Sequence, residues 1–125
     1  MATVLLYNLT DADRRRAVKL CLFRLGLRGR DVATEEFGLP LGALLGLEAA
    51  EAAEPFEPFS DEMLVMHELS RQQFSALLEA LRRSRVLIAL KAVVTPTNVG
   101  WSSVRLHREL QAEHAAMLAG AKKIH

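Results

Sequence analysis

The residues whose types and spacing best suit ligand chemistry lie between positions 91 and 102. The candidate ligand-binding residues are Lys91, Thr95, Thr97, Asn98, Trp101 and Ser102. They follow an expected strand and precede an expected helix, whose first backbone N–H groups lack partners and attract anions. The pattern therefore predicts a pocket for a small anionic ligand. The alternative is that these hydroxyl and amide groups only satisfy turn and cap hydrogen bonds, while Trp101 anchors the helix.

Catalytic groups are not evident in the chain. The sequence has no nucleophile–base pair in a known pattern and no Gly-x-Gly-x-x-Gly or Walker loop, so we assign no catalytic residue and no cofactor. Cys21 shares an apolar helical stripe with Val18 and Leu22, which is typical of a buried side chain rather than a nucleophile. An enzyme alternative would use Lys91, Thr95 and Asn98 as polar groups of the same pocket.

The last expected helix carries two histidines, which are common metal ligands. His107, Gln111 and His114 follow one another at spacings of four and three residues. Two histidines seven residues apart, with a glutamine between them, do not converge on one ion without further ligands. We therefore expect a surface or interface helix and no metal site.

The elements that position these residues form two similar halves. In residues 3–34, an apolar run ends at the capping-box pattern that starts at Thr10, and an amphipathic helix and a short strand at about 30–34 follow. In residues 63–95, a second apolar run ends at the capping box of Ser70 and Gln73, before another amphipathic helix and a strand at 86–94. Leu9-Thr10 and Leu69-Ser70 lie sixty positions apart, and a third helix is expected at 103–119.

Two strand–helix–strand halves predict an α+β fold. We expect a ferredoxin-like β-α-β-β-α-β sandwich, with both helices on one face of a four-stranded antiparallel sheet and an added C-terminal helix. Residues 1–125 are expected to form a single domain, in which 35–62 is a connecting segment and 96–119 is the loop and last helix. The connecting segment is expected to seal the core edge, or alternatively to form a mobile lid.

Charge is unevenly distributed along the chain. Residues 1–30 carry seven Lys or Arg and two Asp or Glu, residues 31–70 carry ten acidic and no basic residues, and residues 71–125 carry nine basic and three acidic residues. Because the acidic middle can compensate the basic flanks, and because Tyr7 is the only aromatic residue suited to base stacking, nucleic-acid binding is not favoured. The basic helices remain an alternative site for phosphate contacts.

The expected central strands are apolar on both sides. Such strands need cover on both faces of the sheet, so either the last helix or a second copy of the chain is expected to cover the second face. The chain is therefore expected to act by binding, as a homodimer or with a protein partner. Its single cysteine and the lack of a secretory signal or an apolar run of membrane-spanning length favour a soluble, cytoplasmic protein that does not enter the membrane.

One known family shares the motif of the candidate site. Lys91-Ala92, Thr95, Asn98 and Trp101 are followed by Glu109-Leu110 and Glu113-His114, and this pattern resembles an uncharacterised bacterial family, domain of unknown function 3783. Leu5-Leu6-Tyr7-Asn8 and Met63-Leu64-Val65-Met66 are also similar to that family. The resemblance implies no activity, cofactor or substrate, but it draws attention to the same segment as the residue types do.

Overall fold

The computed structural model describes residues 2–49 and 53–123, with side chains described as far as residue 119. The expected connecting segment includes residues 50–52, which lie outside the described residues. The chain divides into two compact units: Met1–Ala33 with Ser60–Thr95, here called the sheet unit, and Thr34–Phe59 with Pro96–His125, here called the α4 unit. The sheet unit thus combines both expected halves.

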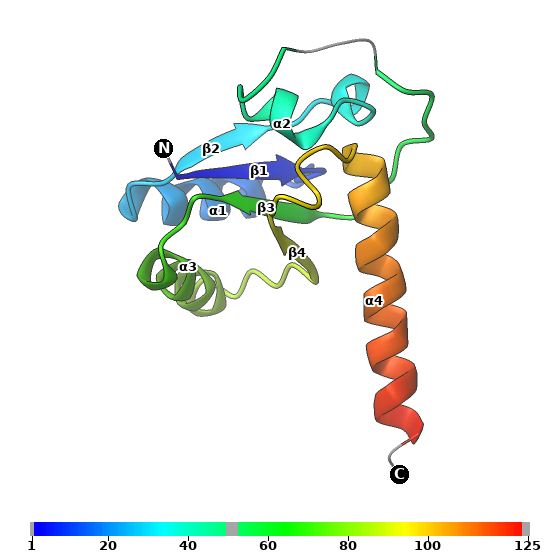
Figure 1. Cartoon of the computed structure of the whole chain (residues 1–125). Helices are drawn as coiled ribbons and strands as arrows, with labels where there is room; N and C mark the ends of the chain where they lie inside the picture. The colour runs from blue at the N-terminus through cyan, green and yellow to red at the C-terminus, as the bar shows by residue number, and fades with distance from the viewer. Residues whose placement is uncertain (1, 50–52, 124–125) are drawn as a thin grey trace. The chain divides into compact units, whose positions relative to one another are not determined.

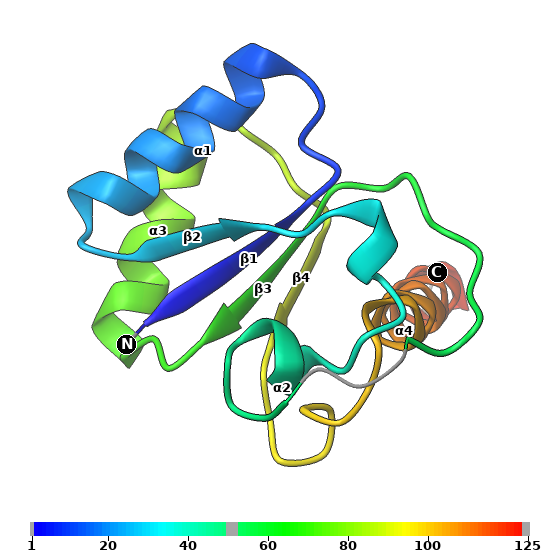
Figure 2. The same ribbon diagram turned by 90° about the horizontal axis from the view of Figure 1, so that it is seen from above.

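A four-stranded sheet and two helices make up the sheet unit. Its elements are β1 (Thr3–Tyr7), α1 (Ala12–Arg24), β2 (Arg28–Asp31), β3 (Met63–His67), α3 (Arg71–Arg83) and β4 (Leu90–Val93). Figure 2 shows α1 and α3 side by side on one face of the sheet. The α+β class and this one-sided placement agree with the sequence prediction.

The strand order does not confirm the ferredoxin-like prediction. The order is β2-β1-β3-β4, with β1 parallel to β2, β3 parallel to β4, and only the central β1–β3 pair antiparallel. The sheet is therefore mixed rather than antiparallel. In the split arrangement, a strand of the other half lies between the two strands of each half. Here each helix returns the chain directly beside the strand it left, so each half is an unsplit βαβ unit.

The two halves are equivalent in backbone detail. Asn8 and Glu68, sixty positions apart, both adopt left-handed backbone conformations directly after β1 and β3. Helix α1 ends with hydrogen bonds from Gly26 N to Phe23 O and from Leu27 N to Leu22 O, the pattern of a Schellman cap. At the end of α3, Arg85 N bonds to Arg82 O and Val86 N to Leu81 O in the same way. The repeat seen in the sequence is therefore a structural duplication.

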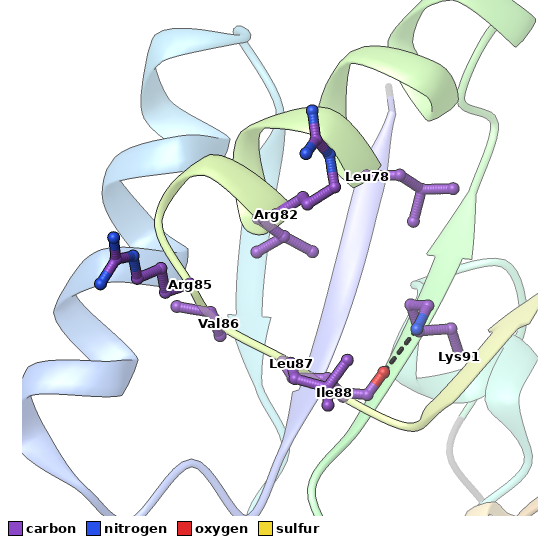
Figure 3. A pocket seen from close by; sticks show the side chains of 8 residues that line it. Leu78, Arg82, Arg85, Val86, Leu87, Ile88 and Lys91 are labelled. Carbon is purple, nitrogen blue, oxygen red and sulfur yellow. Dashed lines mark hydrogen bonds between the residues drawn. The ribbon is translucent and has the colours of Figure 1, made fainter.

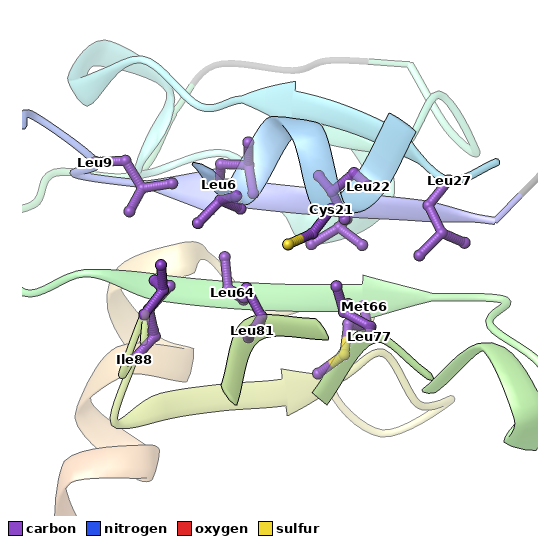
Figure 4. Packing of buried hydrophobic residues seen from close by; sticks show 13 residues of the cluster. Leu6, Leu9, Cys21, Leu22, Leu27, Leu64, Met66, Leu77, Leu81 and Ile88 are labelled. Carbon is purple, nitrogen blue, oxygen red and sulfur yellow. The ribbon is translucent and has the colours of Figure 1, made fainter. Parts of the chain in front are cut away.

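The main core lies between the two helices and the sheet. Figure 4 shows this packing, in which side chains from β1 and β3 meet side chains from α1 and α3. All four apolar residues of the two Schellman caps belong to this core: Leu22 and Leu27 at the end of α1, and Leu81 and Val86 at the end of α3. A hydrophobic contact between these two positions usually accompanies such a cap. The predicted capping box of Ser70 and Gln73 is present, with bonds of 2.8 and 3.0 Å.

The second face of the central strands is also apolar and buried. Leu5, Tyr7, Met63 and Val65 alternate with the core residues along β1 and β3 and so point to the opposite face. None of these four side chains has exposed surface. The expectation that both faces of the central strands are buried is therefore confirmed.

The α4 unit contains the short helices η1 (Thr34–Glu36) and α2 (Leu41–Leu44) and the long helix α4 (Ser103–Lys123), shown in Figure 1. Backbone bonds join its two segments: Leu41 N donates to Trp101 O, and Gly42 N donates to Val99 O. Phe37 is fully buried and stacks on Phe59, with ring centroids 4.6 Å apart. The apolar first part of the connecting segment therefore packs against the start of α4 within one unit.

Candidate functional site

Four of the six predicted site residues, Thr97, Asn98, Trp101 and Ser102, lie in the α4 unit just before α4. Ser102 is buried, and its hydroxyl accepts a bond from Arg105 N, which is the expected cap. Trp101 N donates to Asn98 O, and the Arg105 guanidinium lies 4.3 Å from the centre of the Trp101 ring. Thr97 is exposed. These contacts favour the capping alternative for this segment.

The amides at the start of α4 have partners within their own unit. Val104 N donates to Phe37 O, and Arg105 N donates to the Ser102 hydroxyl. An anion at a helix N-terminus needs such N–H groups to be available. The other two predicted residues, Lys91 and Thr95, belong to the sheet unit.

Lys91 lines a cavity at the C-terminal end of α3. The cavity has a volume of about 420 Å³ and lies between α3, the connection after it and β4. Its lining residues are Leu78, Leu81, Arg82, Arg85, Val86, Leu87, Ile88 and Lys91. Figure 3 shows aliphatic side chains around the cavity, with the Arg82 and Arg85 guanidinium groups at its outer edge, pointing away from each other. Thr95 is exposed and is not among these residues.

Three extra residues in the second half create room for this cavity. In the first half, Leu27 is followed directly by β2, whose first residue Arg28 pairs with Thr3. In the second half, the equivalent Val86 is followed by residues 87–89 before Leu90 pairs with Met63. Arg14 holds this longer connection by donating to Leu87 O at 3.0 Å while it pairs with Glu62.

The three cations of the cavity differ in their partners. The Arg82 guanidinium pairs with Glu79, at 2.6 Å, and this pairing lowers the pKa of Glu79 and raises that of Arg82. Lys91 Nζ donates to Ile88 O, which leaves two of its three N–H donors for other partners. The Arg85 side chain has no hydrogen bond or ion pair with any other residue in the described part of the chain.

Arg85 has a backbone conformation that is unfavourable for arginine. Its φ is +57°, at the position where the first half has Gly26, with φ +70°. A side chain in the left-handed region costs about 1 kcal/mol or more, which glycine avoids. Strained residues of this kind gather at functional sites. From the sequence, Arg82 and Arg85 belong only to the basic helices considered for phosphate contacts, and aligning the two halves is what reveals an arginine in place of Gly26.

Cys21 and His107, considered as a nucleophile and as a metal ligand, are packed in the interior of the protein. Cys21 is buried in the core, with Sγ 3.5 Å from Ser84 Oγ. His107, expected on a surface helix, is instead buried and stacks on Phe59 with centroids 4.0 Å apart, because α4 packs there against the connecting segment. Among the residues that the structure describes, no three His, Cys, Asp or Glu side chains are grouped so as to hold a metal ion. No helix in this part of the chain is long and apolar enough to cross a membrane.

Fold and cavity together define a small duplicated α+β domain with an aliphatic cavity and a cationic edge. Residues 62–117 match the family model of a domain of unknown function, DUF3783, which confirms the family resemblance for this part of the chain. The matched segment contains β3, α3, β4 and the cavity residues, together with most of α4. No curated protein matches the chain.

Proposed function

We propose that this protein is a small binding domain that takes an anionic ligand in the cavity at the end of α3. The observation that carries the proposal is Arg85, a guanidinium without a partner among the described residues, held at the cavity edge in a strained backbone conformation. If this arginine had no ligand, replacing it with glycine would make the protein more stable, and the first half of the chain has Gly26 at the equivalent position. Its charge is therefore the property that the position requires.

Lys91 supports the same proposal from the opposite side of the cavity. Its ammonium is fixed by the Ile88 carbonyl and still carries donors and a full charge. The Arg85 side chain is exposed, so it can change rotamer rapidly and swing over the cavity mouth. Two cations that close on one cavity from two sides suit a negatively charged ligand.

The test compares ligand-induced stabilisation in two arginine variants. A ligand that binds only the folded protein raises its melting temperature by mass action. We expect small organic anions from a panel of carboxylates and phosphates to raise the Tm of the natural protein, and Arg85→Gly to lose that rise while remaining folded. Arg83→Gln is the matched control, because Arg83 is exposed on the last turn of α3 but does not line the cavity. If no anion raises the Tm, or if both variants respond alike, the proposal is wrong.

We also propose that the chain forms a homodimer through α4. The second face of the sheet is buried, whereas residues 111–119 of α4 are exposed, including Met117 at 72% and Leu118 at 54%. Leu110 and Met117 lie on one stripe of α4. If two α4 helices pair antiparallel about the point between residues 113 and 114, Leu110 faces Met117 of the second copy, and Glu113 faces His114. The surface is thus complementary to itself in both apolar and polar positions.

Light scattering after size exclusion tests the dimer. We expect the natural chain to have twice its monomer mass at micromolar concentration, and Met117→Glu to have the monomer mass. Ala112→Glu introduces the same charge on the opposite face of α4 and should leave the dimer intact. A natural chain that is monomeric throughout would rule out this interface.

The compartment we propose is the cytoplasm, where a free buried thiol such as Cys21 stays reduced.

A further inference from the structure

We infer that the ligand of the α3 cavity is an aliphatic carboxylate with a single negative charge. This inference rests on the proposed anion-binding function and specifies the chemical class of the ligand. It follows from the composition of the cavity lining, from the donor character of its polar groups, and from the electrostatics at the end of α3.

The lining favours an apolar ligand body. Five of the eight lining residues are leucine, isoleucine or valine, and they surround the cavity from α3 and from the connection to β4. Leu87 is 83% exposed at this site, although a leucine side chain gains stability when it is removed from water. An aliphatic chain that lies over Leu87 and against Ile88 buries this surface. The cavity volume of about 420 Å³ is at the lower end of the range for small-molecule sites, so the ligand is compact.

The polar side chains of the lining are donors only. They are two arginines and one lysine, and neither type of side chain has a hydrogen-bond acceptor. The carbonyl of Ile88 already accepts from Lys91. Sugars, nucleosides and amines bring several donors and would leave them without side-chain acceptors, which is costly for each donor that binding removes from water. A carboxylate only accepts hydrogen bonds, so it matches this lining.

The position at the end of α3 limits the charge of the head group. The C-terminus of a helix carries a partial negative charge, which opposes a second negative charge on a ligand. The Arg82 guanidinium is engaged by Glu79, which also pairs with Arg83. The remaining attraction comes from Arg85 and Lys91. A dianionic phosphate doubles both the attraction to the two cations and the repulsion from α3, whereas its cost of leaving water rises more steeply with charge, and this cost favours a monoanion.

The experiment measures binding of five probes to the full-length protein by calorimetry and by melting temperature. Octanoate carries both the chain and the carboxylate; acetate has the head group alone, and octanol has the chain alone. Octyl phosphate combines the same chain with a second charge, and inorganic phosphate has neither the chain nor the carboxylate. We expect octanoate to bind at least about tenfold more tightly than each of the other four. Acetate, octanol and inorganic phosphate each lose the chain burial or the charge-assisted contact, and octyl phosphate loses more hydration through its second charge.

Variants and spectroscopy locate the binding. Arg85→Gly is expected to weaken octanoate by about tenfold, and Leu87→Asp to abolish it, while Arg83→Gln binds as the natural protein does. Backbone amide shifts on octanoate addition should concentrate in residues 78–91. Shifts elsewhere, or equal binding of octanol and octanoate, would overturn the inference and the proposed function together. Binding of phosphates with no preference for octanoate would overturn the inference alone, and binding of none of the five probes would overturn both.

Discussion

Leu5 of β1 and Val65 of β3 lie directly opposite each other in the central antiparallel pair, and they occupy equivalent positions of the two halves. The register runs symmetrically about this pair, from Thr3 opposite His67 to Tyr7 opposite Met63. A pseudo-two-fold axis therefore passes between Leu5 and Val65 and relates one βαβ unit to the other. The duplication is a property of the packing as well as of the sequence.

The symmetric pair should be energetically coupled. We expect Leu5→Ala to lower the free energy of unfolding by about 2–5 kcal/mol and Val65→Ala by about 2 kcal/mol, because both side chains are fully buried. The double variant should lose less than the sum, by about 0.5 kcal/mol or more, since the two residues are in contact range. Urea unfolding measures all three. Leu20→Ala, at a 45% exposed position, is the control and should change stability by about 0.5 kcal/mol at most.

The two equivalent cap positions should respond in opposite directions to substitution. Gly26→Ala should destabilise the protein by about 1 kcal/mol, because φ is +70° there while the space for a Cβ is free. Arg85→Gly should stabilise it by about 1 kcal/mol, since it relieves the strain of φ +57°. Gly100→Ala is the control, because that position has free space and no positive φ. Loss of stability in Arg85→Gly would contradict the strain on which the proposed site depends.

The sequence predicted the two halves and the cap of α3 because these depend on local patterns. The cap predicted at Thr10 was wrong, since Asp11 caps α1 by accepting from Arg14 N. The Ser70–Gln73 box joins residues three positions apart. The repeated pair, Leu9-Thr10 and Leu69-Ser70, marks the same short pattern at the start of the helix in each half. The strand order depends on whether the strand after each helix lies next to the strand before it. An amphipathic helix between two apolar runs is compatible with both arrangements, so the sequence does not decide between a split and an unsplit unit. Strand β2 begins at Arg28 instead of near residue 30, since its edge position tolerates exposed arginine.

The candidate site was predicted only in part, because residue type and local position identify Lys91 but not the cavity. Lys91 was chosen as a charge at a strand, and the structure places it at a cavity. Arg85 cannot be singled out from its neighbours by residue type alone; it is distinguished by its backbone angle and by its alignment with Gly26 of the first half. The cavity itself depends on a three-residue difference between the halves after Val86, which becomes visible only once the strand register is known.

Titration of Glu79 tests the charge balance at the cavity edge. Hydrogen bonding to Arg82 holds the pKa of Glu79 below its ordinary value of 4.5. The stabilisation from this carboxylate is therefore present above pH 4.5 and is lost as the pH falls through the lowered pKa. Carboxyl carbon shifts in NMR should show the low pKa, and Arg82→Gln should raise it toward 4.5. Arg71→Gln, at the other end of α3, should leave it unchanged; an equal effect of both variants would contradict the pairing.

Arg14 should control the shape of the cavity from outside it. Its guanidinium donates to both Glu62 oxygens and to the Leu87 carbonyl, and so it connects α1 to the start of β3 and to the connection after α3. Arg14→Lys keeps the charge but cannot make this fork of bonds, so we expect a loss of about 1 kcal/mol in stability and faster hydrogen exchange at residues 87–90. Arg16→Lys is the control, because Arg16 is 80% exposed and its pair with Asp13 spans 3.8 Å. Unchanged exchange at residues 87–90 in Arg14→Lys would mean that Leu87 is held by other contacts, and ligand affinity in that variant should then equal that of the natural protein.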